Sequence, residues 1–100
     1  KDIVNIIVSS QSYDLCRKNA NIIAQEIKSA VLIEGLSDEV EMYSANEAPI
    51  AKIQGRYRFR VWLKCDCAKK FEEILKNVLY KYQNNKEIFV SIDINPISMK

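Results

Sequence analysis

The stretch Arg56-Tyr57-Arg58-Phe59-Arg60-Val61-Trp62-Leu63-Lys64 alternates regularly and holds three of the chain's four arginines. Successive side chains of a β-strand point to opposite faces of a sheet, so the two sets of alternate residues would separate. The first set is basic with one large aromatic: Arg56, Arg58, Arg60, Trp62 and Lys64. The second set is largely apolar: Tyr57, Phe59, Val61 and Leu63. The stretch therefore predicts a strand with one face for a hydrophobic core and one face for an anion.

The positive charge of the chain is concentrated around this strand. From Ala48 to Cys65 there is no acidic residue, and Lys52 adds a fifth basic one. The window carries +5 on a chain of net charge +2, which leaves −3 for the rest. A local basic stripe on a nearly neutral chain indicates a defined anionic partner more than general attraction to nucleic acid or membranes.

The beginning of the chain predicts a strand followed by a helix. Residues 3–8 are rich in β-branched side chains, and their expected inward set is Val4, Ile6 and Val8. Apolar residues then recur at helical spacing from residue 13 to about residue 29. Ser12 precedes this segment and is expected to cap the helix.

The middle of the chain has a weaker pattern. Residues 31–50 predict a connecting segment with one edge strand near residues 39–44. Residues 46–49 end in a proline and predict a loop. The arginine strand would then run from about residue 51 to residue 64, with Gly55 marking a bulge or bend inside it.

The last third predicts a second helix and a final strand. The helix would run from about residue 68 to residue 83, with Asp66 as its cap. Its apolar positions have helical spacing: Phe71, Ile74, Leu75, Val78, Leu79 and Tyr82. Residues 88–95 alternate and Pro96 would end the strand. The expected inward set of this strand is Ile88, Val90, Ile92 and Ile94.

The order strand, helix, strand, strand, helix, strand is the ferredoxin-like arrangement. We therefore expect an α+β fold of βαββαβ order, a two-layer sandwich in which two helices cover one face of a four-stranded antiparallel sheet. Residues 1–100 would form a single domain. The other sheet face would be open, and its outward side chains would include Asn5, Ser9, Arg56, Arg58, Arg60, Trp62, Lys64, Phe89, Ser91 and Asp93.

An open face of this composition suits a nucleic acid. Basic side chains contact phosphates, and aromatic rings stack on bases. The expected phosphate contacts are Lys52, Arg56, Arg58, Arg60 and Lys64, with Trp62 stacking or docking. The alternative is that the arginines are solubilising residues on a solvent-exposed face, paired with acidic residues on neighbouring strands. Trp62 and Phe89 would then be packing residues.

Catalysis and metal binding are hard to build from this composition. The chain has no histidine, no glycine-rich phosphate loop and no serine or cysteine with a visible base partner. Its three cysteines suit a reducing compartment and are too few for an ordinary zinc site. No apolar run is long enough to span a bilayer. We expect a non-enzymatic, soluble cytoplasmic domain without metal or cofactor, and the first residue, Lys1, suggests a fragment of a longer protein.

Two motifs give the chain a family resemblance. The first is Ala48-Pro49-Ile50-Ala51-Lys52-Ile53-Gln54-Gly55-Arg56-Tyr57-Arg58, and the second is Ile92-Asp93-Ile94-Asn95-Pro96 near the end. Together they resemble the C-terminal domain of primosomal protein N′, the bacterial replication-restart helicase family. That family typically has a second aspartate where this chain has Asn95. The residues that match the family are Gly55, Arg56, Tyr57, Arg58, Asp93 and Pro96.

The resemblance implies a module of a DNA helicase that binds branched or forked DNA and helps to reload the replicative helicase. ATP and zinc would be bound only by upstream regions, not by this domain. The implied partners are forked DNA, the upstream helicase core, and the acidic C-terminal tail of single-stranded-DNA-binding protein. Lys69 and Lys70 would dock that tail, although Glu72 and Glu73 dilute the charge.

Other functions stay open at this point. The basic strand would serve a purely structural role if it packs against the helicase core. An RNA-binding or ribosome-associated module of the same fold is a further alternative. A ligand-binding regulatory domain would need a pocket or a glycine-rich loop that the sequence does not indicate.

Overall fold

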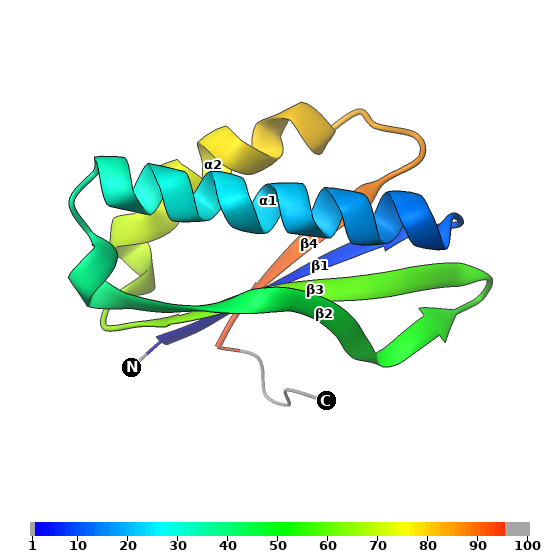
Figure 1. Ribbon diagram of the computed structural model, residues 1–100, viewed down its shortest axis with the longest axis horizontal. Helices are drawn as coiled ribbons and strands as arrows, with labels where there is room; N and C mark the ends of the chain where they lie inside the picture. The colour runs from blue at the N-terminus through cyan, green and yellow to red at the C-terminus, as the bar shows by residue number, and fades with distance from the viewer. Residues whose placement is uncertain (1, 96–100) are drawn as a thin grey trace.

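The computed structural model describes residues 2–95, and for residues 49–51 only the backbone. Four strands in this part of the chain form one antiparallel sheet in the order β2-β3-β1-β4. They are β1 (Asp2–Ser10), β2 (Val40–Ile53), β3 (Arg56–Cys65) and β4 (Phe89–Ile94). The helices α1 (Tyr13–Ile33) and α2 (Glu72–Leu79) both lie on one face of the sheet (Figure 1). Three short 3₁₀ helices complete the described elements: η1 (Ser37–Glu39), η2 (Ala68–Phe71) and η3 (Tyr80–Tyr82). The predicted βαββαβ order and two-layer architecture are confirmed.

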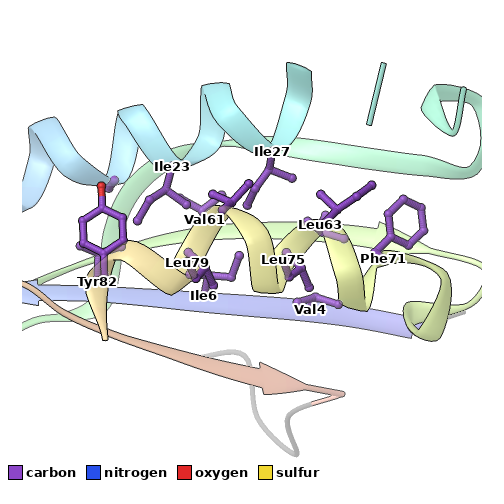
Figure 2. Close-up of a cluster of buried hydrophobic side chains, with 14 of the residues drawn as sticks. Val4, Ile6, Ile23, Ile27, Val61, Leu63, Phe71, Leu75, Leu79 and Tyr82 are labelled. Atoms are coloured by element: carbon purple, nitrogen blue, oxygen red, sulfur yellow. The ribbon is translucent and has the colours of Figure 1, made fainter. Parts of the chain in front are cut away.

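The hydrophobic core lies between the sheet and the helices. Val4 and Ile6 of β1 and Val61 and Leu63 of β3 point into it, as their alternation predicted. Figure 2 shows these side chains packed among those from the helical layer, which are Ile23, Ile27, Phe71, Leu75, Leu79 and Tyr82. Burying one such aliphatic or aromatic side chain stabilises the fold by about 1.5–3 kcal/mol.

Helix α1 begins where the sequence predicts and ends later. The Ser12 hydroxyl accepts a hydrogen bond from the backbone N–H of Leu15 at 3.3 Å, so Ser12 is the N-cap. The expectation of a connecting segment from residue 31 is wrong, because Val31 continues the buried stripe of the helix and is itself buried. Gly35, at φ 72°, ends the helix in the left-handed region that favours glycine.

A two-residue turn joins β2 to β3. Both turn residues have positive φ, 50° at Gln54 and 79° at Gly55, which matches the right-handed twist of the flanking strands. The predictions of a loop at residues 46–49 and of a bulge at Gly55 inside one strand are therefore wrong. Residues 46–49 belong to β2, and their irregularity is absorbed by register shifts between Tyr43 and Asn46 and between Glu47 and Lys52.

The second helical segment is divided into η2, α2 and η3, and Asp66 does not cap it. Instead the Asp2 carboxylate accepts a hydrogen bond from the backbone N–H of Ala68 at 2.7 Å. This bond and one from the Asn95 amide hold the pKa of Asp2 below its usual value of 3.8. The sequence does not reveal this cap because its two partners lie far apart in the chain.

The two ends of the described chain are tied together at the same place. Asn95 donates its backbone N–H to the carbonyl of Ile3 at 2.6 Å, and its side-chain oxygen accepts the N–H of Ile3 at 2.8 Å. Its amide nitrogen also donates to Asp2 at 3.0 Å. Asn95 therefore closes the β1–β4 pair, while Pro96, which was expected to end the strand, lies outside the described residues.

Strand β4 is only partly covered by the helical layer. Ile88 is buried and Val90 packs against the core, as predicted. Ile92 and Ile94 are 43% and 47% exposed, although they were expected to point inward with the other two. They lie on the helix-side face, but β4 is the outermost of the four described strands, and none of the other three covers its outer edge.

Candidate nucleic-acid interface

The face of the sheet turned away from the helices carries the predicted basic set. Along β3, half-buried positions alternate with the buried Phe59, Val61, Leu63 and Cys65. The half-buried positions of the open face are Arg56, Arg58, Arg60, Trp62 and Lys64. Figure 1 shows both helices on the other side of the sheet. The alternation of β3 therefore places five of the six predicted nucleic-acid contacts on one surface.

Lys52 is the exception. It lies opposite Tyr57 in the β2–β3 register, and Tyr57 belongs to the helix-side set. The Lys52 ammonium lies 4.8 Å from the centre of the Tyr57 ring, a cation–π contact. Lys52 is therefore not in the row that the arginines of β3 form on the open face, and its assignment to nucleic-acid contact stays a prediction.

An aromatic pair lies at the centre of the basic face. Tyr43 of β2 is directly opposite Trp62 of β3, and their rings are stacked with centres 3.9 Å apart and planes 6° apart. The Arg60 guanidinium carbon lies 5.6 Å from the centre of the Trp62 ring, within cation–π distance. Tyr43 is not among the residues predicted for the site, although it alternates with Met42, which packs against the core.

Neutral acceptors orient two of the arginines. Arg56 donates from its terminal nitrogen to the backbone carbonyl of Ser9 at 3.1 Å. Arg60 donates from Nε to the side-chain oxygen of Asn46 at 3.4 Å. These acceptors are a neutral carbonyl and a neutral amide, and the two hydrogen bonds orient the guanidinium groups.

An acidic residue, Glu41, contacts the aromatic pair at the Tyr43 hydroxyl. The Tyr43 hydroxyl donates to the Glu41 carboxylate at 2.9 Å. This bond raises the pKa of Tyr43 above its ordinary value. In the strand register Glu41 lies opposite Lys64, so the open face includes one acidic position beside its last basic one.

The central strand β1 contributes a less charged row to the same face: Ile3, Asn5, Ile7 and Ser9. Asn5 lies between Trp62 and Asp93 in the register and is only 8% exposed. Its side-chain oxygen has no hydrogen-bond partner among residues 2–95. The Asn5 side-chain oxygen is therefore a buried hydrogen-bond acceptor among the apolar Ile3 and Ile7 and the aromatic Trp62.

A polar pocket of about 330 Å³ opens at the end of β1. Its lining includes Ser10, Ser12, Arg56 and Lys86, with Glu87 as its acidic member. Lys86 comes from the segment before β4 and is not among the residues predicted for the site. The pocket extends the basic face beyond the start of β3, since Arg56, the first residue of that strand, borders both.

Lys69 and Lys70 lie elsewhere, on the exposed surface of η2. Lys70 forms an ion pair with Glu39 at 2.7 Å, and this hydrogen bond raises the pKa of Lys70. An acidic partner would have to compete with Glu39 for that ammonium group. The assignment of these two lysines to partner docking stays a prediction.

Two of the three cysteines belong to the hydrophobic core. Cys16 and Cys65 are buried, and burial raises the pKa of both thiols. Cys67 is exposed.

Within residues 2–95, no three His, Cys, Asp or Glu side chains gather closely enough to hold a metal ion. No helix in the same part of the chain is long and apolar enough to cross a membrane.

The fold and its surface define a ferredoxin-like domain with an open, basic and aromatic sheet face. The chain aligns over 97% of its length with 98% of the de novo designed protein Foldit4, at a TM-score of 0.66 and 18% identity. It also aligns over 100% of its length with 97% of a dimeric ferredoxin-like protein from an uncultured marine organism (TM-score 0.58, 8% identity). A hydantoinase/carbamoylase family amidase from Burkholderia ambifaria matches 93% of the chain over 27% of the enzyme (TM-score 0.53, 17% identity). These likenesses establish the fold alone.

The sequence profile of the family described as "Primosomal protein N C-terminal domain" matches residues 2–97. The chain therefore belongs to this family, and the resemblance inferred from the two motifs is confirmed. The comparison with curated proteins returned no match.

Proposed function

We propose that this domain is a non-catalytic module of replication restart that binds branched or forked DNA through the open face of its sheet. The observation that carries the proposal is the stacked Tyr43–Trp62 pair with Arg60 against it. Arg58 and Lys64 lie on the same face of β3. Membership of the primosomal family favours DNA over RNA as the nucleic acid that this face would bind.

The face combines the two groups that a DNA strand requires. Phosphates attract arginines and lysines, and binding releases the counterions that the phosphates held. Unpaired bases stack on aromatic rings, a contact worth about 1–3 kcal/mol per base. A fork offers both groups at once, because its unpaired bases lie next to duplex phosphates. The basic residues would therefore follow the backbone while Trp62 and Tyr43 meet an unstacked base.

A second candidate function is docking onto the rest of a longer protein. Ile3 and Ile7 place apolar side chains in the middle of the face, on the central strand, and Phe89 on the same face is 63% exposed. An exposed apolar strip rimmed by polar residues is typical of an interaction surface. In that case the helicase core expected upstream would cover β3, and DNA binding by this domain would be weak.

The experiment measures the affinity of the 100-residue chain for fluorescent forked DNA, single-stranded DNA and RNA across a range of salt concentrations. The test variant combines Arg56→Ala, Arg58→Ala and Arg60→Ala. The control variant combines Arg17→Ala, Lys18→Ala and Lys28→Ala, three exposed positions on α1. Both variants lose the same formal charge, but only the first changes the sheet face. Circular dichroism checks that each variant folds.

We expect the folded test variant to lose affinity for forked DNA while the control variant binds nearly as the parent does. The slope of log affinity against log salt should fall by about 1 for each phosphate contact removed. Equal losses in the two variants would reduce the effect to net charge and contradict the proposal. Negligible binding by the parent chain would favour docking, and a preference for RNA would favour the RNA-binding alternative.

The remaining expectations from the family resemblance stay predictions. They include cytoplasmic location, ATP and zinc bound only by upstream regions, and contact with the acidic tail of single-stranded-DNA-binding protein.

A further inference from the structure

The two edges of the sheet are built differently. Strand β2 carries a proline, charged residues and two register shifts, and these features protect edge strands from pairing with other chains. Strand β4 at the opposite edge has the sequence Phe-Val-Ser-Ile-Asp-Ile. It pairs with β1 without a register shift and contains one charged residue, Asp93. The β4 edge therefore lacks the protection that β2 has.

The backbone of β4 offers hydrogen-bonding groups at this edge. In an antiparallel pair, the backbone groups of alternate residues point toward the partner strand. The Asn95 N–H donates to the carbonyl of Ile3, so the backbone groups of Asp93, Ser91 and Phe89 also point toward β1. The N–H and C=O groups of Val90 and Ile92 consequently point away from β1. Among the described strands none lies beyond them, because β4 ends the sheet.

Apolar surface accompanies this open edge. Phe89, Ile92 and Ile94 are 63%, 43% and 47% exposed. A groove of about 260 Å³ lies beside Phe89 and Ile92, bounded by Leu75, Leu79 and Tyr80 of the helical layer. An extended strand added to β4 would satisfy the backbone groups and cover part of this apolar surface at the same time.

We propose that the β4 edge pairs with the β4 edge of a second copy of this chain, in antiparallel orientation about a two-fold axis at Ser91. In this register Val90 lies opposite Ile92 of the second copy. Both residues present outward backbone groups, so each pair exchanges both of its N–H···O bonds. On the helix-side face an apolar residue therefore meets an apolar residue.

The one charged residue of β4 also suits this register. Asp93 lies opposite Phe89 of the second copy, and Ser91 lies opposite Ser91 of the second copy. Ser91 is small, which suits the close approach of a pair that is not hydrogen-bonded. A two-fold axis at Asp93 would instead place two carboxylates directly opposite each other, which is unfavourable.

One pair of six-residue strands buries less area than a standard interface of about 1,600 Å². We therefore expect a dimer that dissociates on dilution.

Sedimentation of the 100-residue chain over a concentration series tests the association. Ile92→Lys places a charge at the edge, and Ser91→Glu places two like charges opposite each other without changing the core. We expect each folded variant to weaken dimerisation about tenfold or more. The matched control is Ile53→Lys, at a residue that is 41% exposed on the other edge strand. It should associate as the parent does.

Cross-linking tests the register independently. In a Cys67→Ser background, which removes the exposed thiol, Ser91→Cys should form an intermolecular disulfide under mild oxidation. The α-carbons of such a pair lie about 4.5 Å apart, within disulfide range. Asp93→Cys, on the same face of β4, should cross-link much more slowly because its opposite residue is Phe89. A monomeric parent chain, unchanged association of folded Ile92→Lys and Ser91→Glu, or equal cross-linking at the two positions would overturn the proposal.

Discussion

Replacing Tyr43 and Trp62 with leucine, singly and together, measures the energy of the aromatic pair on the basic face. The rings are 3.9 Å apart and nearly parallel, and such pairs contribute about 0.5–1.5 kcal/mol beyond the area that they bury. Each single change removes the stacking and also alters the buried area. In the double variant the free-energy changes from altered burial add, whereas the stacking energy, which each single variant has already lost, is lost only once. The difference between the double change and the sum of the single changes is therefore the stacking energy.

The assay is urea unfolding followed by far-ultraviolet circular dichroism, since Trp62 is the only tryptophan and fluorescence would be lost with it. For a domain of this size the urea dependence is about 1–3 kcal/mol per molar, so a coupling of about 1 kcal/mol corresponds to a midpoint shift of about 0.3–1 M. The control cycle pairs Trp62→Leu with Tyr80→Leu, on the exposed side of η3. Additivity within about 0.3–0.5 kcal/mol for Tyr43 and Trp62 would refute the preformed stacking surface.

Three further predictions concern single contacts. Ser12→Ala removes the N-cap of α1 and should lower the free energy of unfolding by about 1 kcal/mol, whereas Ser12→Gly should cost only a few tenths; equal urea midpoints for all three chains would contradict the cap. The folded pKa of Asp2 is depressed, so its stabilising contribution is present above its usual value of 3.8 and is lost as the pH falls through the folded value. The stability difference between the parent chain and Asp2→Asn should therefore shrink in acid, and a constant difference in urea titrations would argue against the hydrogen bond to Ala68. Combined Lys69→Ala and Lys70→Ala should weaken binding of an acidic peptide, with fluorescence anisotropy as the readout, and unchanged affinity would remove these lysines from the docking site.

The parts of the fold that follow from local patterns could be predicted from the sequence. The alternation in β3 determines which side chains face the core, and the helical spacing of Phe71, Leu75 and Leu79 determines the buried face of the second helical segment. The Ser12 cap is likewise local. These features depend on residues close together in the chain, so their physical causes are visible in the sequence.

Most of the features that the sequence does not reveal depend on distant residues, and one depends on an unusual turn sequence. The pairing of Tyr43 with Trp62 requires the register of β2, which two irregularities shift. The Gln54–Gly55 turn lacks the Asn or Asp before glycine that marks most turns of this kind, and so the hairpin was read as one strand. The exposure of Ile92 follows from the position of β4 at the edge, which alternation alone does not indicate.

The contacts between Asn95, Ile3 and Asp2 also determine how the domain responds to mechanical force. β1 and β4 are antiparallel, so Asp2 and Asn95 lie at the same end of the strand pair. Tension applied between these two residues would load the hydrogen bonds one after another, beginning at Asn95, and peel β4 away from the sheet. Strands pulled from opposite ends would share the load over all their bonds at once. The domain should therefore yield at low force when pulled through these positions, with β4 as the first element to detach.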